Sequence, residues 1–299
     1  MRDRTLGQVM RRLCGVRLGR FEQHPPCALD AWQPAAPRVA DAGLPGICCV
    51  TPSYNQGEYI ARAVRSVLGQ SYPALHYVVQ DACSTDQTQQ ELQAFGSQLE
   101  LHREADSGQA DAINRGFARC SAELMCWLNA DDILLRGAMH HVAQYFMQHP
   151  AVDVVYGDRL VLDVHDRVIG RWILPRHDAR VLRRIDYVPQ ETLFWRRRAW
   201  ERIGAQLDTS LDFAIDWDLL LRFDAAGCRV EHIPRLLGGF RVHAAQKTQL
   251  ALKRNGRAEM RLLRERSAGG ARPMAGSARH MLYLLRHIGA DQAYRRSRV

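Results

Sequence analysis

Residues 126–135 read CWLNADDILL, an apolar run interrupted by one amide and two adjacent carboxylates. The pattern predicts a buried strand that delivers Asn129, Asp131 and Asp132 into a cleft. Two carboxylates about 4 Å apart repel by roughly 4 kcal/mol at a protein-surface dielectric, which favours a compensating cation. Carboxylate oxygens suit Mg²⁺ or Mn²⁺. In an alternative interpretation, Asp132 caps the following helix and Asp131 points to water.

Upstream of this stretch, short apolar runs alternate with segments of helical periodicity. One helix is expected with Ile60, Val64, Val67 and Leu68 on one face. Others are expected from a capping box of Ser84 and Gln87 to about Phe95, and around Ile113 and Phe117. Strands are expected at GICCV (46–50), LHYVVQDA (75–82), LELHRE (99–104) and ELMCWLN (123–129).

This alternation predicts an α/β fold with a mainly parallel central sheet covered by helices on both faces. In such sheets ligands bind beyond the carboxyl ends of the strands. Residues 51–55, Asp81 and 129–132 all fall at such ends. Their convergence at one edge predicts a binding site there.

Downstream, the pattern becomes mixed. Residues 152–175 alternate apolar and polar side chains around a turn near His165 and Asp166, which predicts a hairpin added to the sheet. Residues 192–204 indicate a strand and a helix, 211–227 an amphipathic helix, and 228–234 another strand.

The two ends of the chain differ from its middle. Residues 1–45 contain five prolines and predict an irregular, basic lead-in. Residues 249–299 are rich in arginine and predict a helical extension. Its last helix places Met281, Leu284, Leu285 and Ile288 on one face. That face is expected to dock on the core, with an anionic membrane surface as the alternative partner.

The composition of the chain favours some classes of protein function over others. Of the 299 residues 46% are hydrophobic and 24% charged, with a net charge of +9, which favours acidic partners such as nucleotides or phospholipid head groups. The eight cysteines lack the spacing of a zinc site or disulfide scaffold. The basic ends lack a nucleic-acid recognition motif, so no specific nucleic-acid binding is expected. Neither a signal peptide nor a bilayer-spanning run is found, which predicts a cytoplasmic protein with at most peripheral membrane contact.

Six segments together resemble the inverting GT-A glycosyltransferases of family 2, in that family's order and over 46–248. They are TPSYNQGEYI (51–60), QDACSTDQT (80–88), EADSGQADAINRGFA (104–118), WLNADD (127–132), AIDWDLLLR (214–222) and FRVHAAQKT (240–248). The resemblance implies a GT-A, Rossmann-like domain with a nucleotide-sugar half, 46–133, and an acceptor half, 134–248. It also implies a nucleotide-sugar donor, a glycan or lipid-linked acceptor, and one Mn²⁺ or Mg²⁺ ion bridging the diphosphate.

The resemblance assigns roles residue by residue. Asp216 corresponds to the catalytic base, and the metal position falls on Asp131, with Asp132 close behind and His243 as a further ligand. The remaining candidates divide between the two substrates. Nucleotide-sugar contacts fall on Pro52, Tyr54, Asp81, Asp106, Asn129 and Asp131, and acceptor-side contacts on Gln190, Glu191 and Trp217.

Each role has a structural alternative. Asp218 is expected to pair with Arg222 one turn later on the helix, and Trp217 has burial in the core as its alternative. The chain departs from the family pattern at Asn129, where an acidic residue is usual, and at Ala82 and Cys83, where glycines are common. A non-catalytic nucleotide-sugar-binding module is therefore the competing hypothesis. Sugar-nucleotide pyrophosphorylases are disfavoured because residues 51–60 contain no glycine-rich phosphate loop.

Overall fold

The computed structural model describes residues 20–34, 43–246, 255–268 and 278–297. Three predicted regions lie outside the described residues. They are residues 1–19 of the basic lead-in, the domain boundary at 248, and residues 269–277 of the helical extension. Part of the predicted irregular lead-in is described. There a short 3₁₀ helix, η1 (Leu29–Trp32), follows Cys27, which forms a β-bridge with Val168.

The N-terminal half of the sheet is parallel, as predicted. Its strands lie in the order β3-β2-β1-β4. Their bounds are β1 (Ile47–Ser53), β2 (Leu75–Asp81), β3 (Glu100–Arg103) and β4 (Leu124–Trp127). The connections carry α2 (Ile60–Leu68), α3 (Thr88–Gln93), the 3₁₀ helix η2 (Gly96–Gln98) and α4 (Gln109–Ala118).

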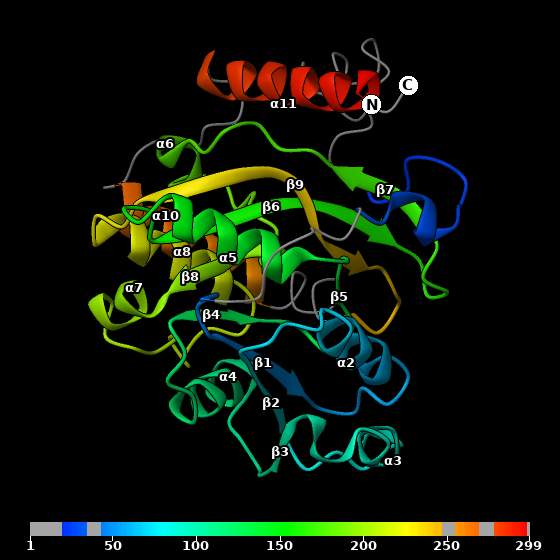
Figure 1. Cartoon of the computed structure of the whole chain (residues 1–299). Coiled ribbons are helices and arrows are strands. Elements are labelled where there is room, and N and C mark those ends of the chain that lie inside the picture. The colour runs from blue at the N-terminus through cyan, green and yellow to red at the C-terminus, as the bar shows by residue number, and fades with distance from the viewer. Residues whose placement is uncertain (1–19, 35–42, 247–254, 269–277, 298–299) are drawn as a thin grey trace.

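The second half continues the same nine-stranded sheet with mixed directions (Figure 1). Its strands are β5 (Ile133–Leu134), β6 (Val154–Leu162), β7 (Val168–Trp172), β8 (Phe194–Arg196) and β9 (Val230–Arg241). Strand β8 runs antiparallel between β4 and β6 and joins the halves. The predicted hairpin is confirmed as β6 and β7, and β9 lies parallel to β6.

The helices of this half are mostly short. They are α5 (Ala138–Gln148), α6 (Ala179–Leu182), the 3₁₀ helix η3 (Gln190–Thr192), α7 (Arg197–Arg202), α8 (Ile215–Ala225), α10 (Arg257–Ala268) and α11 (Ala278–Arg296). No helix of the described part of the chain is long and apolar enough to cross a bilayer.

The alternation of side chains along β1 divides the core into two layers. Ile47 and Cys49 pack with α2 and α5 on one face of the sheet, whereas Cys48 and Val50 pack with α4 and α8 on the other. Helix α4 approaches β1 closely at Gly116, where an added Cβ would lie 2.5 Å from Val50 Cγ1. Both faces of β1 are therefore covered, which explains why its first four residues, Ile47 to Val50, are all apolar and buried.

The predicted capping box at Ser84 is wrong. Helix α3 begins four residues later, at Thr88, whose amide donates to Asp86 Oδ1 at 3.0 Å. Ser84 instead donates its hydroxyl to Oδ1 of Asp81 at the end of β2. The side chain therefore stabilises the turn that leaves the strand, in competition with a helix cap.

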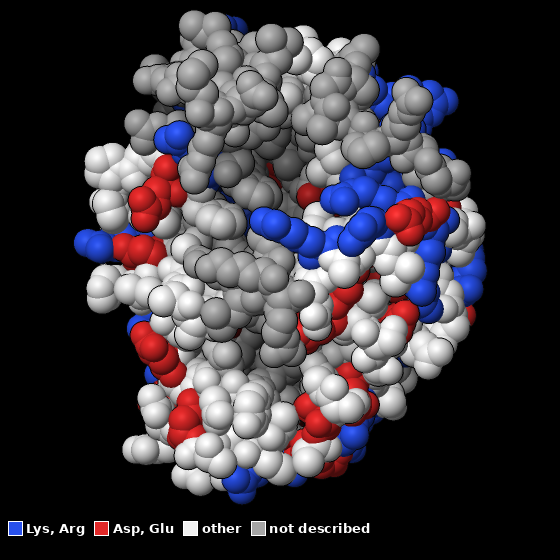
Figure 2. Space-filling model, turned by 180° about the vertical axis from the view of Figure 1, so that it is seen from behind, with Lys and Arg blue, Asp and Glu red and all other residues white. Residues whose placement is uncertain are grey.

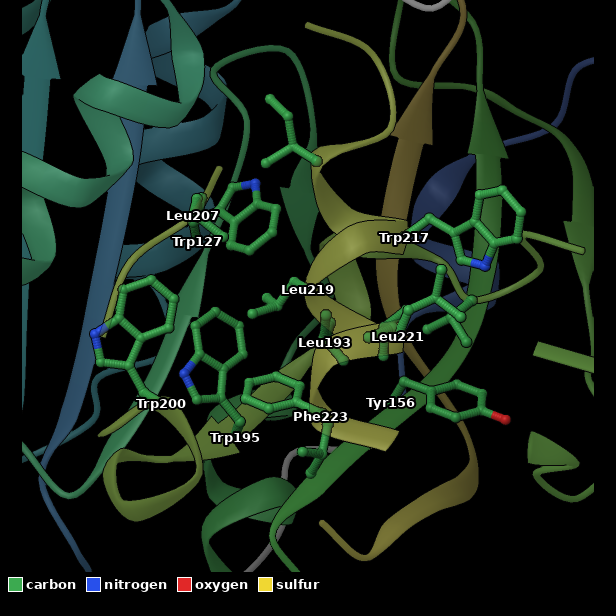
Figure 3. Packing of buried hydrophobic residues seen from close by; sticks show 14 of the residues in the cluster. Trp127, Tyr156, Leu193, Trp195, Trp200, Leu207, Trp217, Leu219, Leu221 and Phe223 are labelled. Carbon is green, nitrogen blue, oxygen red and sulfur yellow. The ribbon is translucent and has the colours of Figure 1, made fainter. Parts of the chain in front are cut away.

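Helix α8 is more deeply buried than the predicted amphipathic pattern implies. The helix lies between the sheet and helices α6 and α10, so residues on several of its sides are buried. The buried residues include Trp217, Leu219, Leu220, Leu221 and Phe223. Figure 3 shows Leu219, Leu221 and Phe223 among the aromatic residues of the core. This placement holds the N-terminal end of α8, which carries Asp216, rigidly.

The predicted docking of the last helix on the core is confirmed. Leu284 and Ile288 of α11 are buried, and Asp291 forms an ion pair with Arg171 of β7 at 2.9 Å. Leu285, expected on the same face, remains 47% exposed because it lies toward the opposite side of the helix.

Candidate active site

A cavity of about 410 Å³ opens at the carboxyl ends of β1 and β4. Both halves of the chain contribute to its wall. Among the residues predicted from sequence, those that line it are Pro52, Tyr54, Asp106, Asn129, Asp131, Asp132, Gln190 and Asp216. Residues that the sequence did not single out also line it, among them Ser53, Gln109, Trp127, Phe213 and Gln246. The cavity thus brings Asp131 and Asp216 to one site.

The loop after β1 is held by the loop after β2. The amide of Asn55 donates to Ser84 Oγ at 2.8 Å, and that of Gly57 donates to Asp86 Oδ2 at 2.9 Å. A side chain at Gly57 would meet Gln87 at 2.5 Å, so the contact requires glycine. The loop leaves Tyr54 61% exposed at the cavity. An exposed ring on a rigid loop is suited to stacking on a planar ligand.

Asp81 is fully buried at the end of β2 and does not line the cavity. Its carboxylate accepts from the amide and hydroxyl of Ser84, and Arg103 Nε lies 4.0 Å away. Asp81 therefore stabilises the loop after β2 from the buried side. Its predicted contact with a nucleotide stays a prediction.

Asp106 lines the cavity just before α4. Its Oδ1 accepts from the amide of Gly108, whose φ of +123° is a conformation that glycine adopts readily. Burial raises the pKa of Asp106, and the nearby Asp111 adds to the effect.

The amide side chain of Asn129 is oriented from both sides. Gln109 Nε2 donates to its Oδ1 at 2.8 Å, and its Nδ2 donates to Asp132 Oδ2 at 3.3 Å. Asp132 is 2% exposed, and its Oδ1 accepts from the amide of Arg241 at 3.0 Å. The proposed helix cap is excluded because α5 begins only at Ala138.

Asp131 is more accessible than its neighbour and contacts His243. His243 Nε2 lies 3.0 Å from Asp131 Oδ2, and its ring packs 4.5 Å from that of Tyr59. His243 itself is buried and does not line the cavity. Burial and then the charge of Asp131 raise the pKa of Asp132 well above its usual value. A cation near Asp131 would relieve this repulsion.

Asp216 lines the cavity from the first turn of α8. Its Oδ1 accepts from the amide of Trp217 at 2.9 Å. Burial raises the pKa of Asp216 to about 6, although backbone hydrogen bonds oppose the shift. A carboxylate with a pKa near working pH is suited to accepting a proton.

Two ionisable residues near Asp216, Asp186 and Arg159, were not identified as candidates from the sequence. Burial, and then the charge of Asp216, raise the pKa of Asp186 well above its usual value. Arg159 lowers the pKa of Asp216 and pairs with Glu191 at 2.9 Å. Asp186 precedes a Tyr-Val-Pro segment that shows no periodicity, so only the folded chain reveals its position.

The three predicted acceptor-side residues lie in different environments. Gln190 lines the cavity and donates to the carbonyl of Trp127 at 2.8 Å. Glu191 is 2% exposed and faces Arg159 instead, so it lies behind the wall. Trp217 is fully buried, its Nε1 donating to the carbonyl of Leu182 at 2.8 Å. Figure 3 shows it on the opposite side of α8 from Trp127. The predicted acceptor-side contact of Trp217 is therefore wrong, and the alternative, burial in the core, is confirmed.

Several buried polar atoms in the cavity wall have no hydrogen-bond partner within the described part of the protein. They belong to the lining residues Ser53, Trp127, Gln190 and Gln246. Buried polar atoms are normally paired. These atoms are therefore available to a polar ligand.

The family model of glycosyl transferase family 2 matches residues 48–227, more than half of the chain. The chain belongs to this family. It is 28% identical over 214 residues to the O-antigen biosynthesis protein RfbC of Myxococcus xanthus, covering 70% of this chain but 16% of RfbC. It is also 28% identical over 185 residues to a PGL/p-HBAD biosynthesis glycosyltransferase of Mycobacterium bovis, covering 60% of this chain and 69% of that relative.

Solved glycosyltransferases share the fold. The mannosyltransferase PcManGT of Pyrobaculum calidifontis, in complex with GDP-Man and Mn²⁺, aligns with a TM-score of 0.59 and 20% identity over 87% of this chain and 74% of its own. TarS of S. aureus, residues 1–349 with UDP-GlcNAc, aligns with a TM-score of 0.57 and 17% identity over 68% of this chain and 60% of its own. The predicted GT-A fold is confirmed.

One departure from the family 2 pattern has a visible local consequence. Cys83, where glycine is common, has a φ of +58°, a left-handed conformation that costs a side chain free energy. The turn therefore keeps the backbone that glycine would adopt, and the thiol points outward, since Cys83 is exposed.

Proposed function

We propose that this family 2 protein transfers a sugar, with inversion, from a nucleotide diphosphate sugar to a hydroxyl of a glycan or lipid-linked acceptor in polysaccharide biosynthesis. The observation that carries the proposal is the single cavity lined by Asp131 and Asp216 from the two halves of the chain. We take UDP-sugars as the first donors to test, because uridine is the commonest base in the family.

The donor is proposed to lie across the carboxyl ends of β1 and β4. Tyr54 would contact the base, Asn129 the ribose, and the unpaired polar atoms of Ser53 and Gln246 other polar groups of the donor. Hydroxyl and amide groups can both donate to and accept from such a ligand.

A divalent cation fits the residues at the diphosphate end. In the part of the chain that the structure describes, no group of three or more His, Cys, Asp or Glu side chains forms a complete site. Mg²⁺ and Mn²⁺ are often held by one or two carboxylates together with substrate phosphates. Asp131 would hold the ion, with His243 and Asp132 beside it. When bound, the ion supplies Lewis-acid neutralisation of the leaving diphosphate.

Asp216 is proposed as the general base. Its carboxylate would accept the proton of the acceptor hydroxyl while that oxygen bonds to the anomeric carbon and the bond to the diphosphate breaks. A single displacement from the opposite side inverts the anomeric centre. Gln190 and Trp127 line the same cavity and would position the acceptor.

The proposal is tested with purified full-length protein, Mn²⁺ and a panel of nucleotide sugars, by thermal shift and then by release of nucleoside diphosphate. A matching donor should raise the melting temperature by mass action and be consumed when acceptor is added. The competing hypothesis, a binding module that acts in an assembly complex, predicts tight donor binding in calorimetry with neither hydrolysis nor transfer. We expect the enzyme to act in the cytoplasm.

A further inference from the structure

A second cavity lies away from the candidate active site, between α6 and α11. Its volume is about 450 Å³, and the residues that line it come from the segment around α6 and from the first turns of α11: His177, Asp178, Ala179, Arg180, Arg279, Leu282, Tyr283 and Arg286. We call it the α6–α11 cleft. Nothing in the proposed transfer reaction uses it.

The cleft is positively charged. Three arginines, Arg180, Arg279 and Arg286, line the cleft together with one acidic residue, Asp178. That carboxylate already accepts from the amide of Arg180 at 3.0 Å, and Arg286 Nη1 lies 3.7 Å from it. Seen from behind, Figure 2 shows Lys and Arg side chains gathered in the upper half of the molecule, on the side where Figure 1 places α6. The cleft therefore retains positive charge for an anionic ligand.

The outer face of α11 combines this charge with exposed leucines. Leu282 is 48% and Leu285 47% exposed, and both lie between the arginines of the helix. The only acidic residue of α11, Asp291, is buried and paired with Arg171 and Arg295. Among the described residues, the exposed face of α11 thus presents cations and apolar side chains, and Asp178, 3.7 Å from Arg286 Nη1, is the one carboxylate of the cleft beside them.

We infer that the α6–α11 cleft and the outer face of α11 bind the surface of an anionic phospholipid bilayer. The arginines would contact lipid phosphates while Leu282 and Leu285 enter the acyl boundary, as in helices that lie flat in the interface. Figure 1 shows α11 lying across one end of the molecule. An acidic peptide would satisfy the arginines but would leave the leucines in water.

The test is cosedimentation of the full-length protein with sucrose-loaded vesicles, without donor or acceptor. We expect binding to vesicles of equal parts phosphatidylglycerol and phosphatidylcholine and none to pure phosphatidylcholine. Each basic residue near such a surface contributes enough that the double variant Arg180→Gln/Arg279→Gln should bind roughly 30-fold more weakly. Leu282→Ser/Leu285→Ser should also weaken binding without changing the melting temperature.

The matched control removes two exposed arginines, Arg65 in α2 and Arg119 directly after α4, and Figure 1 draws these helices at the other end of the molecule. Arg65→Gln/Arg119→Gln has the same net charge as the cleft variant and should bind like the unchanged protein. Equal loss in both double variants would mean that net charge alone attracts the protein, and would overturn the inference. So would absence of binding, or preference for soluble polyglutamate over vesicles. Vesicle binding is measured without transfer, so its failure leaves the proposed enzyme activity standing.

Discussion

His243 Nε2 lies 3.0 Å from Asp131 Oδ2, although 112 residues separate the two in the sequence. The antiparallel pairing of β5 with β9, in which Ile133 faces Gly239, brings the ends of the two segments together. The same pairing places the amide of Arg241 against Asp132. Sheet topology thus assembles the acidic end of the cavity.

This contact predicts the phenotype of His243→Ala. If His243 orients Asp131 toward a cation, its loss should raise the Mn²⁺ concentration for half-maximal activity by about tenfold to 100-fold, as loss of residues that orient metal ligands does. The measurement is a manganese titration of activity at saturating donor, with His243→Gln as the conservative comparison. An unchanged titration curve in both variants would limit His243 to a packing role beside Tyr59.

Asp216→Asn should lower kcat by about 10²-fold to 10⁴-fold, because the acceptor hydroxyl loses its proton acceptor. Donor affinity measured by calorimetry should change little, since the residue is proposed to act on the acceptor. The matched control is Asp218→Asn in the same helix, where the ion pair with Arg222 at 3.6 Å indicates a structural role. Full activity in Asp216→Asn would contradict the mechanism.

The pH dependence of kcat/KM should follow Asp216. Burial raises its pKa to about 6, and only the deprotonated form can act as a base. The rate should therefore rise with pH up to about 6 and level off above it. In Asp216→Asn the residual rate should lose this ascending limb, which a pH profile of both proteins checks.

The raised pKa of Asp216 also predicts that stability falls over the pH range in which activity rises. Between the usual pKa of 3.8 and about 6 the folded protein holds a proton on Asp216 that the unfolded chain has released. The free energy of unfolding therefore falls as pH rises through this window and stays lower above it. Asp216→Asn should raise the melting temperature at pH 7.5 more than at pH 4.5. An equal shift at both values would indicate that burial does not disfavour the carboxylate.

Trp217 should behave as a core residue. Trp217→Ala removes a fully buried ring and is expected to lower the free energy of unfolding by about 3–5 kcal/mol. Trp217→Phe should cost less and keep KM for the acceptor near that of the unchanged protein. Denaturant unfolding and steady-state kinetics of the two variants distinguish this from an acceptor-binding role, which would raise KM in a stable Trp217→Phe protein.

The local pattern of apolar and polar residues was sufficient to predict much of the fold. The alternation of apolar strands and helical segments up to Trp127 placed four parallel strands, and the polar residues at their ends placed the edge that bears the cavity. It was insufficient at Ser84, where a strand-end turn and a helix cap use the same residue type. Ser84 bonds to Asp81, three residues earlier at the end of β2, whereas α3 begins only at Thr88.

The family, the α/β alternation and the candidate base Asp216 could be predicted from the amino-acid sequence, because motifs and periodicity are local properties of the chain. The folded chain was needed to show that Trp217 is a core residue, that Glu191 pairs with Arg159, and that Asp186 lies near Asp216. Burial and pairing depend on residues far apart in the chain. Adjacent residues of similar polarity, such as Gln190 and Glu191, can therefore end on opposite sides of one cavity wall.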